Sequence, residues 1–96
     1  MLKDIIFNLK GQYFDDIKAG VKTEEYRIYK DFWKKRLEGK EYKNIIIKKG
    51  YPAKDDISKI IIIPWSGYVI KEITHPEFGE KPVKVYAIKL NKKTDL

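Results

Sequence analysis

Residues 13–27 read Tyr13-Phe14-Asp15-Asp16-Ile17-Lys18-Ala19-Gly20-Val21-Lys22-Thr23-Glu24-Glu25-Tyr26-Arg27. In the first half of this stretch the apolar residues recur at spacings of three and four, which predicts a short helix over 12–19. Gly20 is typical of a helix end, because glycine adopts the left-handed backbone conformation at low cost. After the glycine the apolar spacing changes towards two, so a strand is expected over 22–29. The stretch therefore predicts a helix, a sharp turn and a strand in succession.

Alternation along this strand separates polar from apolar side chains. Thr23, Glu25 and Arg27 share one face. Tyr26 and Ile28 occupy the opposite face and, being the apolar residues, are expected to be buried. The polar face is therefore expected to line a cleft or a barrel mouth.

Lys22, at the turn, is expected to lean over the same cleft. The cluster would then offer an ammonium, a hydroxyl, a carboxylate and a guanidinium within a few ångströms, enough to hold a polar, planar or anionic ligand. The alternative is an ordinary surface ion pair between Glu25 and Arg27, which contributes about 0 to 1 kcal/mol.

The rest of the chain predicts one more helix and five more strands. The alternation of Ile5, Phe7 and Leu9 predicts a first strand. A second short helix is expected over 32–38, capped by Asp31 and ended by Gly39. The other strands are rich in Ile, Val and Tyr and are expected over 44–48, 59–64, 68–73 and 83–90.

These elements predict an α+β fold of about six strands, with both short helices in the N-terminal half. So many strands in a short chain favour closure into a small β-barrel, which removes exposed edges. The run from Ile60 to Ile63 is apolar on both faces, which indicates a strand that is central or covered by a helix.

Composition indicates one small domain. The chain has 96 residues, of which 43% are hydrophobic, so one domain is expected over 1–90 with a polar tail over 91–96.

The lack of cysteine excludes disulfides and thiolate zinc sites, and it favours a reducing compartment. No apolar run approaches the roughly 20 residues that span a bilayer, and the start does not resemble a secretion signal. A cytoplasmic protein without a membrane partner is expected.

Positive charge is concentrated in the middle of the chain. The net charge is +7, and residues 18–50 alone carry eleven basic and five acidic residues, a net charge of +6. Such a surface attracts phosphates and favours a nucleic acid or nucleotide partner. The alternative is that the lysines only keep the protein soluble.

The spacing Gly20-x-Lys22-x-x-Glu25-x-Arg27, after an aromatic-rich helix, resembles the signature of the ASCH domain, a family in the PUA-like superfamily of small β-barrels. The resemblance extends over nearly the whole chain, to a compact bacterial and phage-associated branch, through Trp33-Lys34-Lys35-Arg36-Leu37, Gly50-Tyr51-Pro52, Pro64-Trp65-Ser66-Gly67-Tyr68 and His75-Pro76-Glu77-Phe78-Gly79. It implies RNA binding in a cleft formed by the barrel and the helix before the motif.

The same resemblance suggests an enzymatic alternative. Certain bacterial relatives are amidohydrolases acting on N4-acylated cytidine, and they use a lysine that matches Lys22, a threonine at the position of Glu25, and a further glutamate. Glu72, Glu77 and Glu80 are all open candidates for the glutamate. A carboxylate beside a lysine favours its charged form, whereas a nucleophilic lysine must be neutral. Lys22 and Glu25 are the candidate catalytic residues of such an enzyme, but the carboxylate of Glu25 argues against a nucleophilic role for Lys22. A ribonuclease activity has also been proposed in the family.

Further candidate ligand contacts lie outside the motif. Trp65 and Tyr68 flank a turn, where an exposed aromatic ring could stack on a base for about 1 to 3 kcal/mol; the alternative is that both close the barrel end. The basic cluster Lys34, Lys35 and Arg36 is either a phosphate contact or a solvated helix face.

His75 is the only histidine, which excludes a two-histidine acid/base pair for RNA cleavage. It is expected either as a turn residue or as a ligand contact. One histidine and scattered carboxylates provide no metal-ligand spacing, and no Gly-rich phosphate loop, hydride-cofactor fingerprint or serine nucleophile elbow occurs. The sequence thus predicts a protein without metal or cofactor that binds RNA or a nucleotide-like ligand, with a non-catalytic protein-interaction module as the other alternative.

Overall fold

The computed structural model describes residues 1–90. In chain order its elements are β1 (Ile5–Leu9), α1 (Gly11–Lys18), β2 (Glu24–Ile28), α2 (Asp31–Leu37), β3 (Asn44–Lys49), η1 (Ile57–Lys59), β4 (Ile60–Pro64), β5 (Tyr68–Ile73), η2 (Pro76–Phe78) and β6 (Val83–Lys89), where η marks a short 3₁₀ helix. The predicted α+β class, with six strands and two α-helices in this part of the chain, is confirmed. The tail expected over 91–96 lies outside the described residues.

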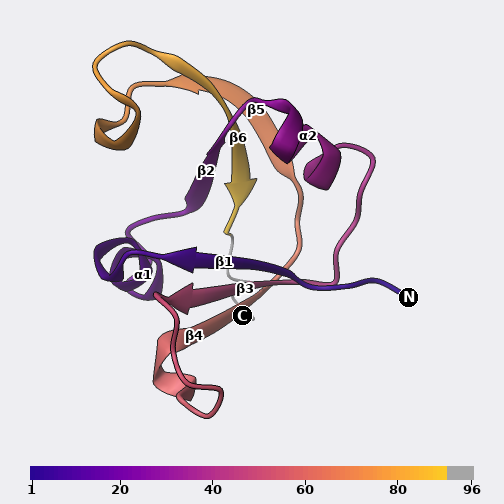
Figure 1. The fold of residues 1–96 in the computed structure, drawn as a ribbon, viewed down its shortest axis with the longest axis vertical. Helices are drawn as coiled ribbons and strands as arrows, with labels where there is room; N and C mark the ends of the chain where they lie inside the picture. Colours follow the sequence, from indigo (N-terminus) through magenta and orange to yellow (C-terminus); the bar gives the residue numbers. More distant parts are fainter. Residues whose placement is uncertain (91–96) are drawn as a thin grey trace.

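The strands form two open three-stranded sheets (Figure 1). The first has the order β1-β3-β4, with β1 parallel and β4 antiparallel to the central β3. The second has the order β2-β6-β5 and is antiparallel throughout. Strand pairing within residues 1–90 does not join the two sheets, so the closed barrel expected from the sequence is not confirmed.

The core lies where the inner faces of the two sheets and one side of each helix meet. β1 alternates strictly between buried and exposed residues, and its inward-facing Phe7 pairs with Ile47 of β3. Burying one such side chain contributes about 1.5 to 3 kcal/mol. The buried cluster draws on both sheets and both helices and comprises Ile5, Phe7, Leu9, Phe14, Ile17, Leu37, Ile45, Ile47, Ile63, Tyr86, Ile88 and Leu90.

Two glycines end the helices as expected. Gly20 and Gly39 have φ angles of 79° and 71°, in the left-handed region that favours glycine. The predicted cap of the second helix is wrong, because Asp31 is the first residue of α2 and the preceding Lys30 occupies the cap position without a side-chain hydrogen bond. The carboxylate of Asp31 in the first turn still complements the helix dipole.

The expectation that the run Ile60 to Ile63 is central or covered is also wrong. In the described part of the chain, β4 is an edge strand that pairs only with β3. Alternation turns Ile63 into the core at 0% exposure and leaves Ile62 at 62%. A run of identical apolar residues does not reveal which face is buried, because alternation of hydrophobicity is the signal that distinguishes them.

These two neighbours give a direct test of the fold. We expect Ile63→Ala to lower the free energy of unfolding by about 2 to 5 kcal/mol, because it leaves a cavity in the core. Ile62→Ala is expected to cost about 1 kcal/mol or less, mainly through lost strand propensity. Urea denaturation of both variants measures the difference, and equal losses would contradict the orientation of β4.

Candidate functional site

A pocket of about 200 Å³ lies between α1, β2 and the loop that joins β5 to β6. The turn at Gly20 returns the chain from α1 into β2, so the helix start and the strand both contribute walls. Its lining residues are Asn8, Leu9, Lys10, Tyr13, Lys22, Glu25, Tyr26, Arg27, His75, Glu77 and Phe78.

Glu25 is the buried residue of β2, with 6% of its surface exposed. It lies opposite Ile88 of β6, and Arg27 lies opposite Tyr86. Residues directly opposite one another share a sheet face, and both β6 residues belong to the core. The polar face of β2 is therefore the inward face, and the pocket borders the core at the β2 edge.

This orientation corrects the sequence-based assignment of the β2 faces. Ile28, expected to be buried, is 36% exposed. Tyr26 is half-buried and lines the pocket. Its hydroxyl donates to Glu24 at 2.9 Å; burial and this hydrogen bond raise the pKa of Tyr26. Hydrophobicity alone did not predict the buried face because ion pairs compensate the polar side chains that occupy it.

Glu25 forms two ion pairs. Arg27 Nη2 lies 2.7 Å from Glu25 Oε2, and Lys22 Nζ lies 3.4 Å from Glu25 Oε1. Removing a carboxylate from water costs several kcal/mol unless opposite charges and hydrogen bonds compensate. The two cations supply that compensation and leave the group with one excess positive charge. In addition, the buried Arg27 Nε has no hydrogen-bond partner among residues 1–90.

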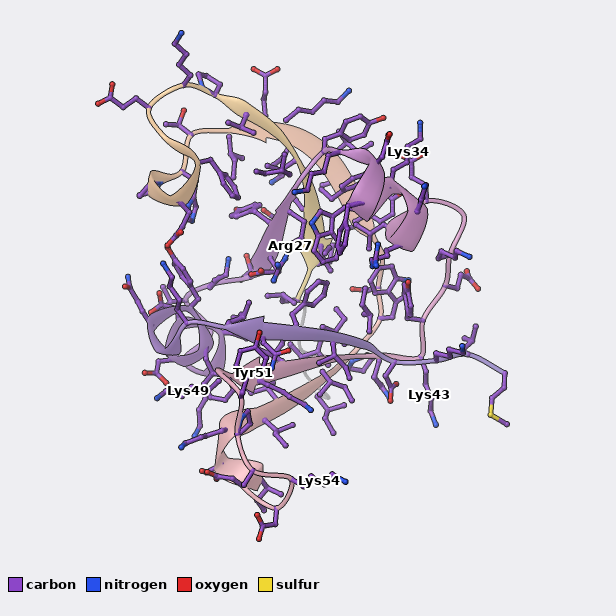
Figure 2. All side chains as sticks on the ribbon, in the orientation of Figure 1. Arg27, Lys34, Lys43, Lys49, Tyr51 and Lys54 are labelled. Atoms are coloured by element: carbon purple, nitrogen blue, oxygen red, sulfur yellow. The ribbon has the colours of Figure 1, made fainter. Side chains whose placement is uncertain are left out.

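Aromatic rings surround both cations. Lys22 Nζ lies 4.8 Å from the ring centroid of Tyr26 and 5.6 Å from that of Tyr13. The Arg27 guanidinium lies 4.7 Å from the Phe7 ring centroid and 5.0 Å from that of Trp33. At these distances the ring faces attract the cations. Figure 2 shows Arg27 in the space between the two sheets.

Glu77 connects the β5–β6 loop to the start of α1. Its Oε1 atom accepts from Lys10 Nζ at 2.7 Å and from Tyr13 Oη at 3.1 Å. These two hydrogen bonds lower the pKa of Glu77, while burial and the bond to Glu77 raise the pKa of Tyr13. Of the three glutamates that the sequence offered as candidates, Glu77 is the one that lines the pocket. Glu72 lies in β5, opposite Lys84 of β6.

His75 both shapes the loop and lines the pocket. Its Nδ1 accepts the backbone N–H of Glu77 at 3.1 Å, which caps η2. The neutral ring therefore carries its proton on Nε2. The ring centroid lies 5.8 Å from that of Tyr13, 6.0 Å from that of Tyr26 and 5.3 Å from that of Phe78. His75 thus acts as a turn residue and also lies where it could contact a ligand, so the two interpretations from the sequence are compatible.

Several candidate residues lie outside the pocket. Thr23 is exposed, and its carbonyl accepts the Leu90 N–H at 2.9 Å. Trp65 and Tyr68 pack beside the core, against Tyr42 and Tyr86 respectively. The exposed cations of α2 are also outside the pocket; they are Lys34, Lys35 and Arg36.

The sequence did not predict four of the pocket residues, which are Asn8, Leu9, Lys10 and Phe78. It predicted Tyr13 and Tyr26 only as apolar packing residues of the helix and the strand. The one available signal was the position of Tyr13 on the apolar stripe of α1, since the hydroxyl of a partly buried tyrosine needs a polar partner. Lys10 had no such signal, because its partner lies 67 residues away in the sequence.

Residues 1–90 contain no group of three or more His, Cys, Asp or Glu side chains placed to hold a metal ion. No helix in the same range has the length and apolar character needed to cross a membrane. Comparisons with protein-family models, with curated proteins and with solved structures find no match to this chain.

The pocket yields a test based on pH. The pKa of Glu77 is lowered on folding, so its contacts stabilise the folded chain above the ordinary glutamate pKa and are lost as the pH falls through the lowered value. Lys10→Met should raise the pKa of Glu77 towards its ordinary value, measured by NMR titration of the side-chain carboxyl carbon. The exposed Lys43→Met serves as the control. A Glu77 pKa that Lys10→Met does not change would refute the contact.

Proposed function

We propose that the pocket binds a single nucleobase within a nucleotide or an RNA strand. The observation that carries this proposal is the nearly buried Glu25 carboxylate, held by Lys22 and Arg27 beside aromatic rings. The ASCH resemblance implies the same class of ligand at the same residues. The PUA-like barrel that the resemblance also implies remains part of this proposal, supported by two sheets that share one core.

The size of the pocket favours a small planar ligand. Pockets for drug-sized molecules measure about 300 to 1,000 Å³, whereas this one measures about 200 Å³. A single base or nucleoside is of a suitable size, and a paired or stacked run of bases is not.

The polar groups suit the edge of a base. Each ionised carboxylate offers about four acceptor positions, and Glu25 uses one towards Arg27 and one towards Lys22. The remaining positions can accept from an exocyclic amino group, as Glu and Asp do from cytosine N4. The excess positive charge of Lys22 and Arg27 over Glu25 suits a carbonyl oxygen or a phosphate. Tyr13, Tyr26 and His75 can provide a stacking surface.

A second candidate is hydrolysis of an N4-acylated cytidine. Lys22 and Glu77 line the same pocket, which favours this reading. The 3.4 Å contact between Lys22 Nζ and Glu25 Oε1 opposes it, because the ion pair engages the amine that a nucleophile would need free. Incubation with N4-acetylcytidine, alongside an active relative, decides the matter: release of cytidine supports hydrolysis, and no release with a working control excludes it.

The binding proposal predicts a preference among bases. Cytidine monophosphate should bind at least about tenfold more tightly than uridine monophosphate, because uracil presents a carbonyl to Glu25 where cytosine presents a donor. Calorimetry at low salt measures both affinities.

Matched variants test the site itself. Lys22→Met should weaken binding of cytidine monophosphate by about tenfold through loss of the ammonium, while the exposed Lys81→Met should not. Thermal unfolding verifies that both variants fold. The proposal fails if the unmodified chain binds neither nucleotide at low salt, or if the two variants bind equally well.

A further inference from the structure

A second concentration of positive charge lies on and around α2. Lys35 and Arg36 in the helix, Lys40 after it and Lys3 near the chain start line a separate hollow of about 510 Å³. Among residues 1–90, Glu41 is the one carboxylate in that lining. We call the four cations the α2 basic surface.

Within residues 1–90, no ion pair involves these four cations. The ion pairs within residues 1–90 involve the other cations Lys10, Lys22, Arg27, Lys49, Lys59 and Lys71. Glu38, the residue after α2, accepts from the buried Tyr86 hydroxyl at 2.6 Å. The α2 basic surface therefore keeps its charge, which attracts polyanions.

Aromatic and guanidinium groups connect this surface to the pocket. The Arg36 guanidinium lies 3.6 Å from the centroid of the Phe32 ring, and Phe32 is 49% exposed. The ring of Phe32 lies 4.9 Å from that of Trp33, which lies 5.0 Å from the Arg27 guanidinium. These four side chains form a continuous series from the pocket to the outer side of α2.

Further cations lie on the same side of the molecule. Figure 2 shows Lys34 beside α2 and Lys43 towards the N-terminal end of the ribbon, both on the right of the view, whereas Lys49 lies on the left. Exposed aromatic rings beside a basic surface are the combination with which proteins bind single-stranded nucleic acids, through base stacking and phosphate contacts.

We propose that the α2 basic surface binds the phosphates of a single-stranded polynucleotide. Phe32 stacks on one base of this strand, and another base of the same strand occupies the pocket. The inference rests on the proposed function for the second base, and it assigns the phosphate backbone a site of its own. It follows that affinity increases with strand length beyond one nucleotide.

The test compares cytidine monophosphate with cytidine oligonucleotides of two to eight residues, as RNA and as DNA. In Lys35→Gln/Lys40→Gln, affinity for the eight-residue strand should fall at least tenfold. The negative slope of log affinity against log salt concentration should become shallower by about 1.4, or about 0.7 for each lost phosphate contact. Affinity for cytidine monophosphate should stay within about twofold. An oligonucleotide that binds more tightly than cytidine monophosphate supports the inference, whether it is RNA or DNA. The tighter-binding of the two strands identifies the kind of nucleic acid that the surface prefers.

A second double variant controls for net charge. Lys48→Gln/Lys54→Gln removes the same charge from β3 and the loop before η1, and it should change neither affinity nor slope appreciably. Phe32→Leu keeps an apolar side chain without an aromatic face. It should lower the affinity for the eight-residue strand by about fivefold or more. Circular dichroism verifies that each variant folds.

Two results would overturn the inference: equal weakening by the two double variants, or an eight-residue strand that binds no more tightly than the mononucleotide. These failures differ from failure of the pocket. If cytidine monophosphate does not bind but Lys35→Gln/Lys40→Gln still weakens the long strand selectively, the pocket proposal falls and the α2 basic surface stands.

Discussion

Arg27 lies where β1, β2 and α2 meet. Its guanidinium extends from β2, pairs with Glu25 at 2.7 Å, and lies against the rings of Phe7 in β1 and Trp33 in α2. A guanidinium in this position needs an acceptor, because an unpaired charge removed from water is strongly destabilising. The ion pair and the two aromatic contacts therefore fix how one sheet meets the other and place the pocket beside their junction.

The ion pair occupies positions that hydrophobic side chains could fill. Glu25 and Arg27 lie opposite the core residues Ile88 and Tyr86. Replacing a buried ion pair by apolar residues is often neutral or stabilising in proteins, so stability alone does not explain why these two positions carry charges. A polar pair in the lining of a pocket is what a ligand site would require. The same reasoning distinguishes this cluster from ordinary surface ion pairs such as that between Lys59 and Asp56.

Local patterns predicted the elements well. Alternation in β1 and the glycine after α1 were sufficient to place them within a few residues. Sheet order could not be predicted in this way: β4 is an edge strand, and its four consecutive isoleucines give no alternation to show it. Closure into a barrel was likewise inferred from strand number, which does not determine pairing.

The candidate site could be predicted only where its residues are close in sequence. Lys22, Glu25 and Arg27 lie on one strand and the turn before it, so spacing alone brought them together. Glu77 joins them from the loop between β5 and β6, through contacts to Lys10 and Tyr13 that span more than 60 residues. Contacts at such separations depend on the tertiary fold, and no local pattern contains them.

The most direct test of the account is an NMR titration of the chain with cytidine monophosphate, observing the side-chain N–H signal of Arg27 Nε and the carboxyl carbon of Glu25. The account predicts that both signals move with one saturating dependence on nucleotide concentration, and that the remaining large changes occur at residues lining the pocket. Saturable changes confined to other surfaces, with the Arg27 and Glu25 signals unmoved, would contradict it.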